Sequence, residues 1–447
     1  MLRGMDLWLP GYLASLRRRP RHTGGTRHLM VALCDHYEPY RGGVDDAAAR
    51  AHVARWTTAY PAMAEPFRDS DGGMPRHTFF YPAEEYDPTC LDALGDLMRQ
   101  GCGEVEIHLH HRHDTPEGLR DKLVRFRDLL HTQHGMLGKI NHGLHGWSRM
   151  APDGAGERDA INHGGDGDTL RVVNSPADDE HPSPSVSSVV NSPAFAFIHG
   201  NWSLCNSRPD GDWCGVNEEL SILAETGCYA DLTFPSAPSP TQPRTVNSIY
   251  RAHDNPNGRG HDHGTRLRVT SSGCDQQPAD NVAGIEGGGI PPTQSPQHFP
   301  DLRPSASSAG SHLLLIQGPL ALNFARRKYG LLPRIENAEI SAVNPPTPDR
   351  IRLWERTAVH VEGRPEWIFV KLHTHGCVPA NSEALLGDPI RQMHRTLQTH
   401  YNDGRNWQLH YVTAREMTNI ILAAEQGCSG DPGKYRDYRI GQPAAMR

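Results

Sequence analysis

Side chains able to do chemistry gather where four predicted strands end. Imidazole and carboxylate groups are the usual ligands of zinc and similar first-row metals, and a catalytic centre uses about three of them while leaving one position open. The strand ends therefore predict a metal site that activates water. The residues are Asp35, His36 and Glu38 after the first strand, Glu84 and Glu85 after the second, the run from Glu106 to Asp114 around the third, and Lys371, His373 and His375 after a late strand.

The third strand divides its histidines between two faces. Successive side chains of a strand point to opposite sides, so His108 and His110 share one face and His111 falls on the other. We therefore expect His111 to lie outside the site. A short turn after the strand brings either His113 or Asp114 back beside His110.

Repeated strand and helix signals predict the scaffold that positions these groups. Strand then helix in repetition is typical of a parallel sheet, and a sheet whose strands end in polar residues favours a (β/α) barrel with its site at the C-terminal strand ends. The expected strands are 28–36, 76–82, 105–111, 194–202, 228–236, 366–376 and 407–414, and the expected helices are 44–67, 87–103, 115–135, 217–227 and 415–427.

Two stretches interrupt this globular pattern. Residues 149–192 and 253–310 are rich in Gly, Asp, Ser, Pro and Asn and lack an apolar period, so we expect flexible insertions there. The chain holds 44 Gly and 36 Pro in 447 residues, and these stretches explain part of that content. Without them ~345 residues remain, which suits one barrel domain over residues 26–447.

Composition narrows the expected partners and location. The formal charge of −7 argues against a nucleic-acid surface, and no apolar run approaches the ~20 residues that span a bilayer. Nine scattered cysteines without a CxxC pair indicate reduced thiols in a cytoplasmic protein. The 27 histidines predict a surface field that changes strongly near pH 6.5.

Several of these segments resemble the polysaccharide deacetylases of the NodB-homology type, within the glycoside hydrolase/deacetylase barrel superfamily. LCDHYEP is similar to the first family motif, EIHLHHRHD to the second, and VKLHTHG to the last. FIHGNW and DLTFPS fall where strands four and five of that fold stand. The resemblance implies a distorted, seven-stranded barrel and a metal-dependent hydrolase that removes acyl groups from N- or O-acetylated carbohydrate.

The resemblance also implies roles for individual residues. By motif position, Asp35 matches the catalytic base, His110 the first metal histidine and His373 the acid. His375 lies on the same strand face as His373 and is expected to assist it. The expected cofactor is a divalent ion, with Zn2+ favoured.

The chain departs from the family pattern at two ligands. His36 stands where the family has a second aspartate, so Asp35 or His36 is expected to hold the metal with His110. The family places its second histidine four residues after the first, where this chain has Asp114, while His113 is one residue short. We favour His113, because shortening a turn is a smaller change than a change of ligand type.

Two other functions are compatible with the same residues. A barrel glycosidase would use two carboxylates such as Glu85 and Asp231 without an obligatory metal. A catalytically inactive barrel would bind saccharide or a partner protein, and the missing second aspartate favours that alternative. Metal content and the type of bond that is hydrolysed separate the three.

Overall fold

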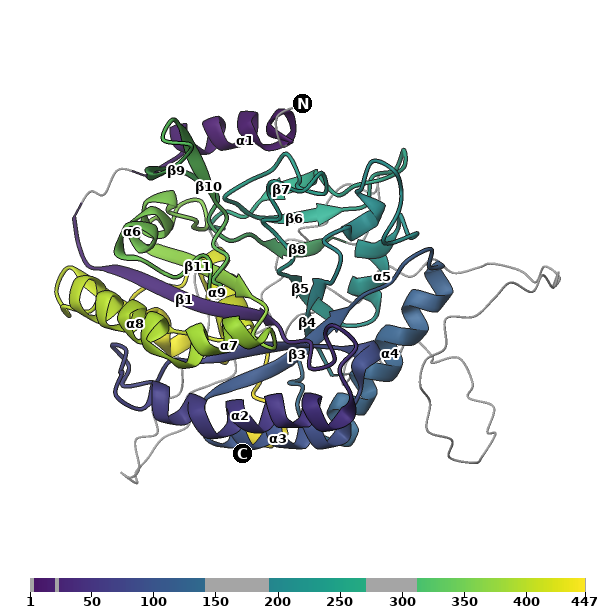
Figure 1. The fold of residues 1–447 in the computed structure, drawn as a ribbon. Helices are drawn as coiled ribbons and strands as arrows, with labels where there is room; N and C mark the ends of the chain where they lie inside the picture. Colours follow the sequence, from purple (N-terminus) through teal and green to yellow (C-terminus); the bar gives the residue numbers. More distant parts are fainter. Residues whose placement is uncertain (1–3, 21–23, 141–192, 271–311, 447) are drawn as a thin grey trace, which may run out of the picture.

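The computed structural model describes residues 4–20, 24–140, 193–270 and 312–446, and Figure 1 shows their arrangement. The first half contains α1 (Met5–Arg17), β1 (Arg27–His36), α2 (Asp46–Ala64), β2 (His77–Pro82), η1 (Ala83–Glu85), α3 (Pro88–Arg99), β3 (Gly103–Leu109) and α4 (Pro116–Thr132). The middle contains β4 (Phe195–His199), η3 (Leu204–Asn206), α5 (Glu219–Glu225), β5 (Cys228–Asp231), β6 (Ile249–His253) and β7 (His263–Arg266). The last part contains β8 (Leu313–Ile316), β9 (Ala321–Lys328), β10 (Leu332–Glu336), α6 (Pro348–Thr357), β11 (Trp367–Thr374), α7 (Pro379–Leu386), α8 (Asp388–Tyr401), β12 (Trp407–Tyr411) and α9 (Ala414–Glu425), followed by the short turns η4 (Pro432–Tyr435) and η5 (Ala444–Met446).

A large, mostly parallel sheet forms the centre of the molecule. Its strand order is β11-β1-β2-β3-β4-β5-β8-β6-β7, and β12 also pairs with β1. β6 pairs antiparallel with β7 and β8, and the other pairs of this sheet in the described part of the chain are parallel. The expected mixed α/β class, with strands and helices in alternation, is thereby confirmed.

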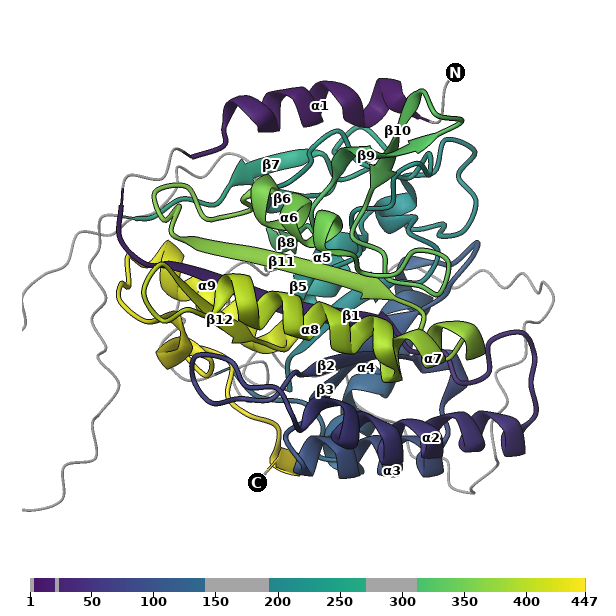
Figure 2. The same ribbon diagram turned by 60° about the vertical axis from the view of Figure 1, so that its left-hand side comes forward.

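Helices cover both faces of this sheet. On one face the apolar residues of β1, β3 and β11 pack against α2, α3 and α4, with Trp56, Leu94 and Leu123 among the buried side chains. Figures 1 and 2 show α2 and α3 together below the sheet, and α8 beside β1 and β11. The opposite face packs against α9, whose residues 414–424 are all buried.

Helix starts follow the capping signals of the sequence. The side chain of Asp45 accepts a hydrogen bond from the Ala48 amide at the start of α2. Thr115 does the same for the Gly118 amide at the start of α4, where Pro116 occupies the first turn. These caps fix where the helices begin after the strand-end loops.

Two elements of the structure lie outside the expected core of the domain. Helix α1 lies before residue 26 yet packs on the fold, because Trp8 and Tyr12 form one buried cluster with Ala237, Val246, Leu320 and Ala321. Part of the expected second insertion is a strand, since β7 pairs with β6. Residues 149–192 and 271–310 lie outside the described residues.

The absence of an apolar period in β7 has a structural cause. Its residues are mostly exposed at the edge of the sheet, so backbone pairing with β6 rather than side-chain burial holds the strand. Composition alone therefore gave no strand signal there.

The expectation of reduced cysteines holds for some of these residues and not for others. The residues Cys34, Cys90, Cys102, Cys205, Cys214, Cys228 and Cys377 are free thiols and buried. Cys428 is disulfide-bonded, so the expectation of reduced thiols is wrong for this residue. A chain without paired cysteine motifs gives no signal for such a bond, because folding brings distant thiols together.

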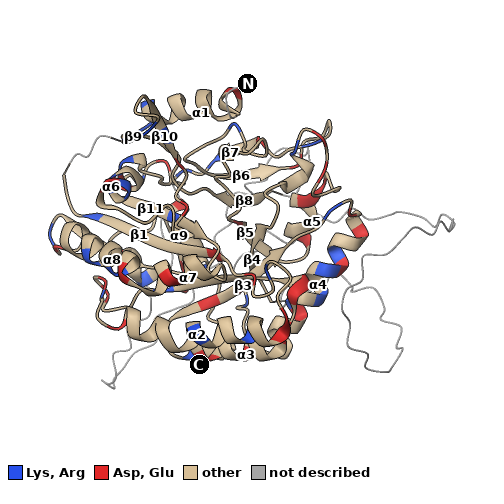
Figure 3. Ribbon diagram, viewed as in Figure 1, with Lys and Arg blue, Asp and Glu red and all other residues tan. Residues whose placement is uncertain are grey.

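Two surface properties bear on the expected partners: the distribution of charged residues and the apolar character of the helices. Figure 3 shows acidic and basic residues interspersed along α4. Among the described residues, no helix combines the length and the apolar character needed to cross a bilayer.

Many histidines are core residues rather than surface groups. Those with little exposure are His28, His36, His77, His108, His111, His199, His261, His373, His394 and His410. The change of surface charge near pH 6.5 is therefore smaller than the count of 27 suggests. Protonation of these side chains instead opposes folding where burial holds their pKa values low.

His394 of α8 provides a test of the link between histidine protonation and folding. Burial lowers its pKa to about 3, while an unfolded chain protonates it near pH 6.5. The unfolded state therefore binds more protons below pH 6.5, and His394 lowers the free energy of unfolding by about 2 kcal/mol between pH 7 and pH 5.

We expect His394→Asn, which keeps an acceptor for the Tyr411 hydroxyl, to remove this pH-dependent loss in urea denaturation. His400→Asn on the exposed side of α8 is the control and should leave the pH profile unchanged. An identical profile for His394→Asn and the unmodified protein would contradict the assignment.

Candidate metal centre

The site lies where β1, β3 and β11 end side by side with β2. In the parallel register Cys34 is opposite His373, and the pairing of β2 with β3 places Pro82 opposite His108. The even-numbered side chains of β1 and the odd-numbered side chains of β11 pack on the face that α9 covers. Glu104 of β3 points to the same face, where it pairs with Arg415 of α9. This register brings His36, His108 and His375 together from three strands.

His36 is the centre of the group. Its ring is fully buried, and neither ring nitrogen has a hydrogen-bond partner. The ring centroid lies 4.7 Å from that of His375 and 4.8 Å from that of His108. Ligand atoms of His36, Glu38 and His108 all lie within 4.8 Å of one another, which is close enough for one ion to contact all three.

The orientation of His108 is fixed by the neighbouring strand. Its Nδ1 lies 3.0 Å from the carbonyl oxygen of Ile198, which only accepts, so Nδ1 carries the proton. In the neutral ring Nε2 is then a bare lone pair, and it lies 3.3 Å from Glu38 Oε1. A lone pair facing a carboxylate oxygen is repulsive unless a proton or a cation lies between them.

Glu38 connects the buried histidines to His110 at the surface. Its Oε1 also lies 3.3 Å from His110 Nε2, and its Oε2 pairs with Arg41. The second nitrogen of His110, Nδ1, lies 2.5 Å from Glu84 Oε1. The His110 side chain is 32% exposed, so it stands between the buried group and solvent.

Burial and neighbouring charges separate the protonation states of these histidines. Burial lowers the pKa of His36 well below 6.5, lowers that of His108, and lowers that of His375 to about 4. Burial also lowers the pKa of His110, but hydrogen bonds to Glu38 and Glu84 outweigh it and raise the pKa to about 10. At neutral pH the rings of His36, His108 and His375 are therefore neutral, as metal ligands must be.

Asp35 lies on the opposite face of β1 from His36. It is fully buried, accepts a hydrogen bond from the Gly376 amide at 2.6 Å, and contacts His77 Nε2 at 2.8 Å. Strand alternation produces this result, because adjacent residues of β1 cannot both face the site. The structure does not bring Asp35 together with the expected metal ligands.

The two candidates for the second ligand of the third strand also lie elsewhere. His113 has a left-handed backbone, a side chain that is 71% exposed, and Asp212 Oδ1 at 3.5 Å. Asp114 accepts from Lys122 Nζ at 2.9 Å and lies 3.4 Å from His111 Nδ1. Neither residue joins His110 in the group around His36.

His373 and His375 are both near His36, but at different distances. The ring centroid of His373 lies 6.4 Å from that of His36, compared with 4.7 Å for His375. Burial lowers the pKa of His373 well below 6.5, so its ring is neutral at pH 7. A neutral imidazole is a weak acid, which makes His373 a poor source of a proton.

Glu38 and His108 stood among the reactive residues at the predicted strand ends, but neither was an expected metal ligand. The period of two on β3 placed His108 beside His110, so that signal was available for His108. Glu38 lies two residues beyond β1, where no strand period applies, and only the folded loop brings it to His108.

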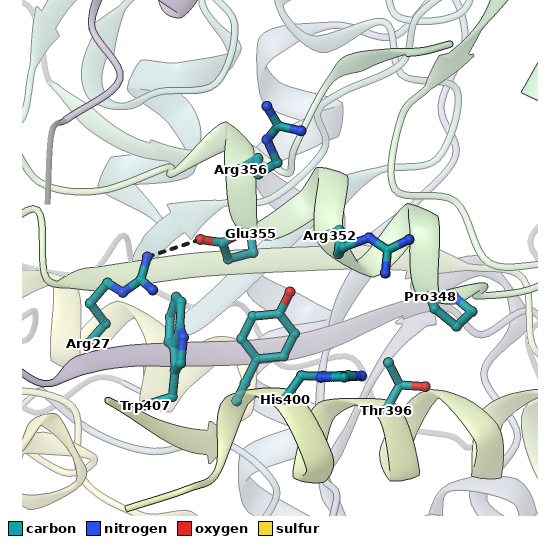
Figure 4. Close-up of a pocket in the computed structure, with 9 residues that line it drawn as sticks. Arg27, Pro348, Arg352, Glu355, Arg356, Thr396, His400 and Trp407 are labelled. Carbon is teal, nitrogen blue, oxygen red and sulfur yellow. Dashed lines mark hydrogen bonds and ion pairs between the residues drawn. The ribbon is translucent and has the colours of Figure 1, made fainter. Parts of the chain in front are cut away.

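A separate cavity of about 280 Å³ lies near the start of β1, and Figure 4 shows its lining. Arg27 lies over the ring of Trp407, 3.7 Å from its centroid, and pairs with Glu355 at 3.4 Å. Arg27 and His36 stand at opposite ends of β1, so this cavity is not part of the histidine group.

The contacts of Asp35 predict a structural role. Asp35→Ala leaves the Gly376 amide and His77 Nε2 without their buried acceptor, so we expect a loss of about 2–4 kcal/mol in the free energy of unfolding. Asp35→Asn keeps one acceptor and should lose less. Urea denaturation of both variants measures the difference, and unchanged stability of Asp35→Ala would rule this role out.

Comparisons of this chain with protein-family models, with curated proteins and with solved structures found no match.

Proposed function

We propose that this protein is a metal-dependent hydrolase that holds a divalent ion, Zn2+ by preference, with His36, Glu38 and His108. This ligand set replaces the expected one of Asp35 or His36 with His110 and His113. Two neutral imidazoles and one carboxylate are a ligand set typical of catalytic zinc, which leaves a position open for water.

The observation that carries the proposal is a group of buried ring nitrogens that lack hydrogen-bond donors or acceptors. Both nitrogens of His36 are unpaired, and the lone pair of His108 Nε2 faces Glu38 Oε1. Buried polar atoms are normally paired, because leaving one unpaired costs about 1–3 kcal/mol. A cation among these three side chains binds one nitrogen of His36, the Nε2 lone pair of His108 and the carboxylate of Glu38.

A divalent ion in such a site polarises a carbonyl group and lowers the pKa of its bound water. The residues of the chain supply the remaining functions. Ile198 holds the His108 ring in the tautomer that leaves Nε2 free. His110, with a carboxylate at each ring nitrogen and one side open to solvent, is placed to deliver a proton to the leaving group.

The substrate class follows from the resemblance to polysaccharide deacetylases and from the surroundings of the group. We propose an acyl group on an N- or O-acetylated carbohydrate, bound at the C-terminal strand ends of a distorted barrel. The ring centroid of Trp202 lies 6.4 Å from that of His36, and an indole face offers a surface for a sugar ring.

The glycosidase alternative gains less support from the described side chains. Asp231 is buried and accepts hydrogen bonds from the amide and the hydroxyl of Thr233. Burial raises the pKa values of both Glu85 and Asp231 to about 7. A glycosidase pair usually separates these values, with one group protonated and the other ionised.

Metal analysis and activity assays test the proposal. We expect His36→Ala and His108→Ala each to lose one equivalent of bound metal, together with hydrolysis of acetyl esters or acetylated amino sugars. His110→Gln should keep the metal and lower kcat by about 10²–10⁴-fold, as expected for loss of a general acid.

His113→Ala is the matched control, because it removes a nearby histidine that lies outside the group. It should keep both metal and activity. Full activity without metal would refute the proposal, and so would loss of the metal in His113→Ala but not in His36→Ala. Cleavage of glycosides in place of acyl groups would support the glycosidase alternative, and metal binding without turnover would support a binding protein.

A further inference from the structure

A second group of chemically reactive side chains lies on the other face of the sheet. It consists of His111 just after β3, His199 at the end of β4, Cys214 in the loop that follows, and Glu219 at the start of α5. All four residues are buried. Strand alternation places His111 and His199 on the face of β3 and β4 opposite to His108 and Ile198.

The distances between these side chains suit one small ion. Glu219 Oε1 lies 3.1 Å from His111 Nε2 and 3.9 Å from His199 Nε2, while Glu219 Oε2 lies 3.4 Å from Cys214 Sγ. All four ligand atoms lie within 4.8 Å of one another. Ligands at zinc distances in a tetrahedron stand roughly 3.3–3.8 Å apart, which is close to these values.

Two of the four side chains have surroundings that suit coordination. The Val216 amide donates to Cys214 Sγ at 3.4 Å and favours the thiolate, while burial and Glu219 raise the pKa of the thiol. Asp114 Oδ2 lies 3.4 Å from His111 Nδ1, so a carboxylate orients this ring while Nε2 faces the group.

His199 Nε2 is fully buried without a hydrogen-bond partner and points into the group. Its Nδ1 accepts from the Asn201 amide at 3.1 Å. Coordination through Nε2 moves the proton to Nδ1, so this amide contact must open when an ion binds.

We propose that His111, His199, Cys214 and Glu219 form a second divalent metal site, of the closed four-ligand type that stabilises structure. The two imidazoles and the thiolate favour zinc over magnesium or calcium, and the one carboxylate is also a common zinc ligand. Four protein ligands leave no position for water or substrate, which distinguishes this site from the group around His36.

The role of the site follows from what its ligands connect. Residues 200–218 join β4 to α5, and the short turn η3 is their only helix or strand. The Asp114 amide donates to the Cys214 carbonyl at 2.9 Å, and a side chain at Gly215 would collide with the Asp114 backbone. A metal joining Cys214 to His111 and Glu219 fixes this long loop against β3 and α5.

Cobalt substitution tests the second site directly, because a thiolate bound to Co2+ produces a sulfur-to-metal charge-transfer band. The ligands around His36 include no sulfur, so this band reports the second site alone. We expect the full chain, stripped by a chelator and titrated with Co2+, to show the band and to bind two equivalents of metal. Cys214→Ala should lose the band and one equivalent.

Cys205→Ala is the matched control, because Cys205 lies in the same loop but directs its Sγ to Asp254 at 3.3 Å. It should keep the band. His36→Ala should lose one equivalent and keep the band, which separates failure of the proposed hydrolase from failure of this proposal. If Cys214→Ala does not fold, the cobalt form of the unmodified chain still tests the proposal. Absence of the charge-transfer band in that form would overturn it, and so would loss of the band in Cys205→Ala.

Discussion

The pairing of β1 on both edges is the constraint on which the candidate metal centre depends. β1 pairs with β11 along eight residues, and its other edge pairs first with β12 and then with β2. Parallel pairing aligns the C-terminal ends of these strands at one edge of the sheet. His36 therefore meets His375 from one side and, across β2, His108 of β3 from the other.

Burial gives these histidines their chemical character. A buried imidazole resists protonation, so His36, His108 and His375 are neutral at a pH where exposed histidines begin to charge. Neutral rings with unpaired nitrogens lower the stability of a core, but they are suited to bind a metal ion. His110 has the opposite character, because two carboxylates stabilise its cation at the entrance to the group.

Strand alternation divides the chemistry of the molecule between two faces. His108 of β3 and His110 just after it both contact Glu38, whereas His111 contacts Asp114 and Glu219. On β1 the same rule separates His36 from Asp35. The two proposed metal sites are thus products of one backbone geometry, with an open group at the strand ends and a closed group under the long loop after β4.

The sequence by itself determined the alternation of strands and helices, the faces of β3, and the location of reactive side chains at strand ends, because these depend on local periodicity and on capping residues such as Thr115. It did not determine which side chains meet. Asp35 matched the catalytic base of the family motif, yet the twofold period of its own strand directs it away from His36. Glu38, Cys214 and Glu219 stand in loops or at a helix start, where no period applies, so only tertiary packing brought them to their histidine partners.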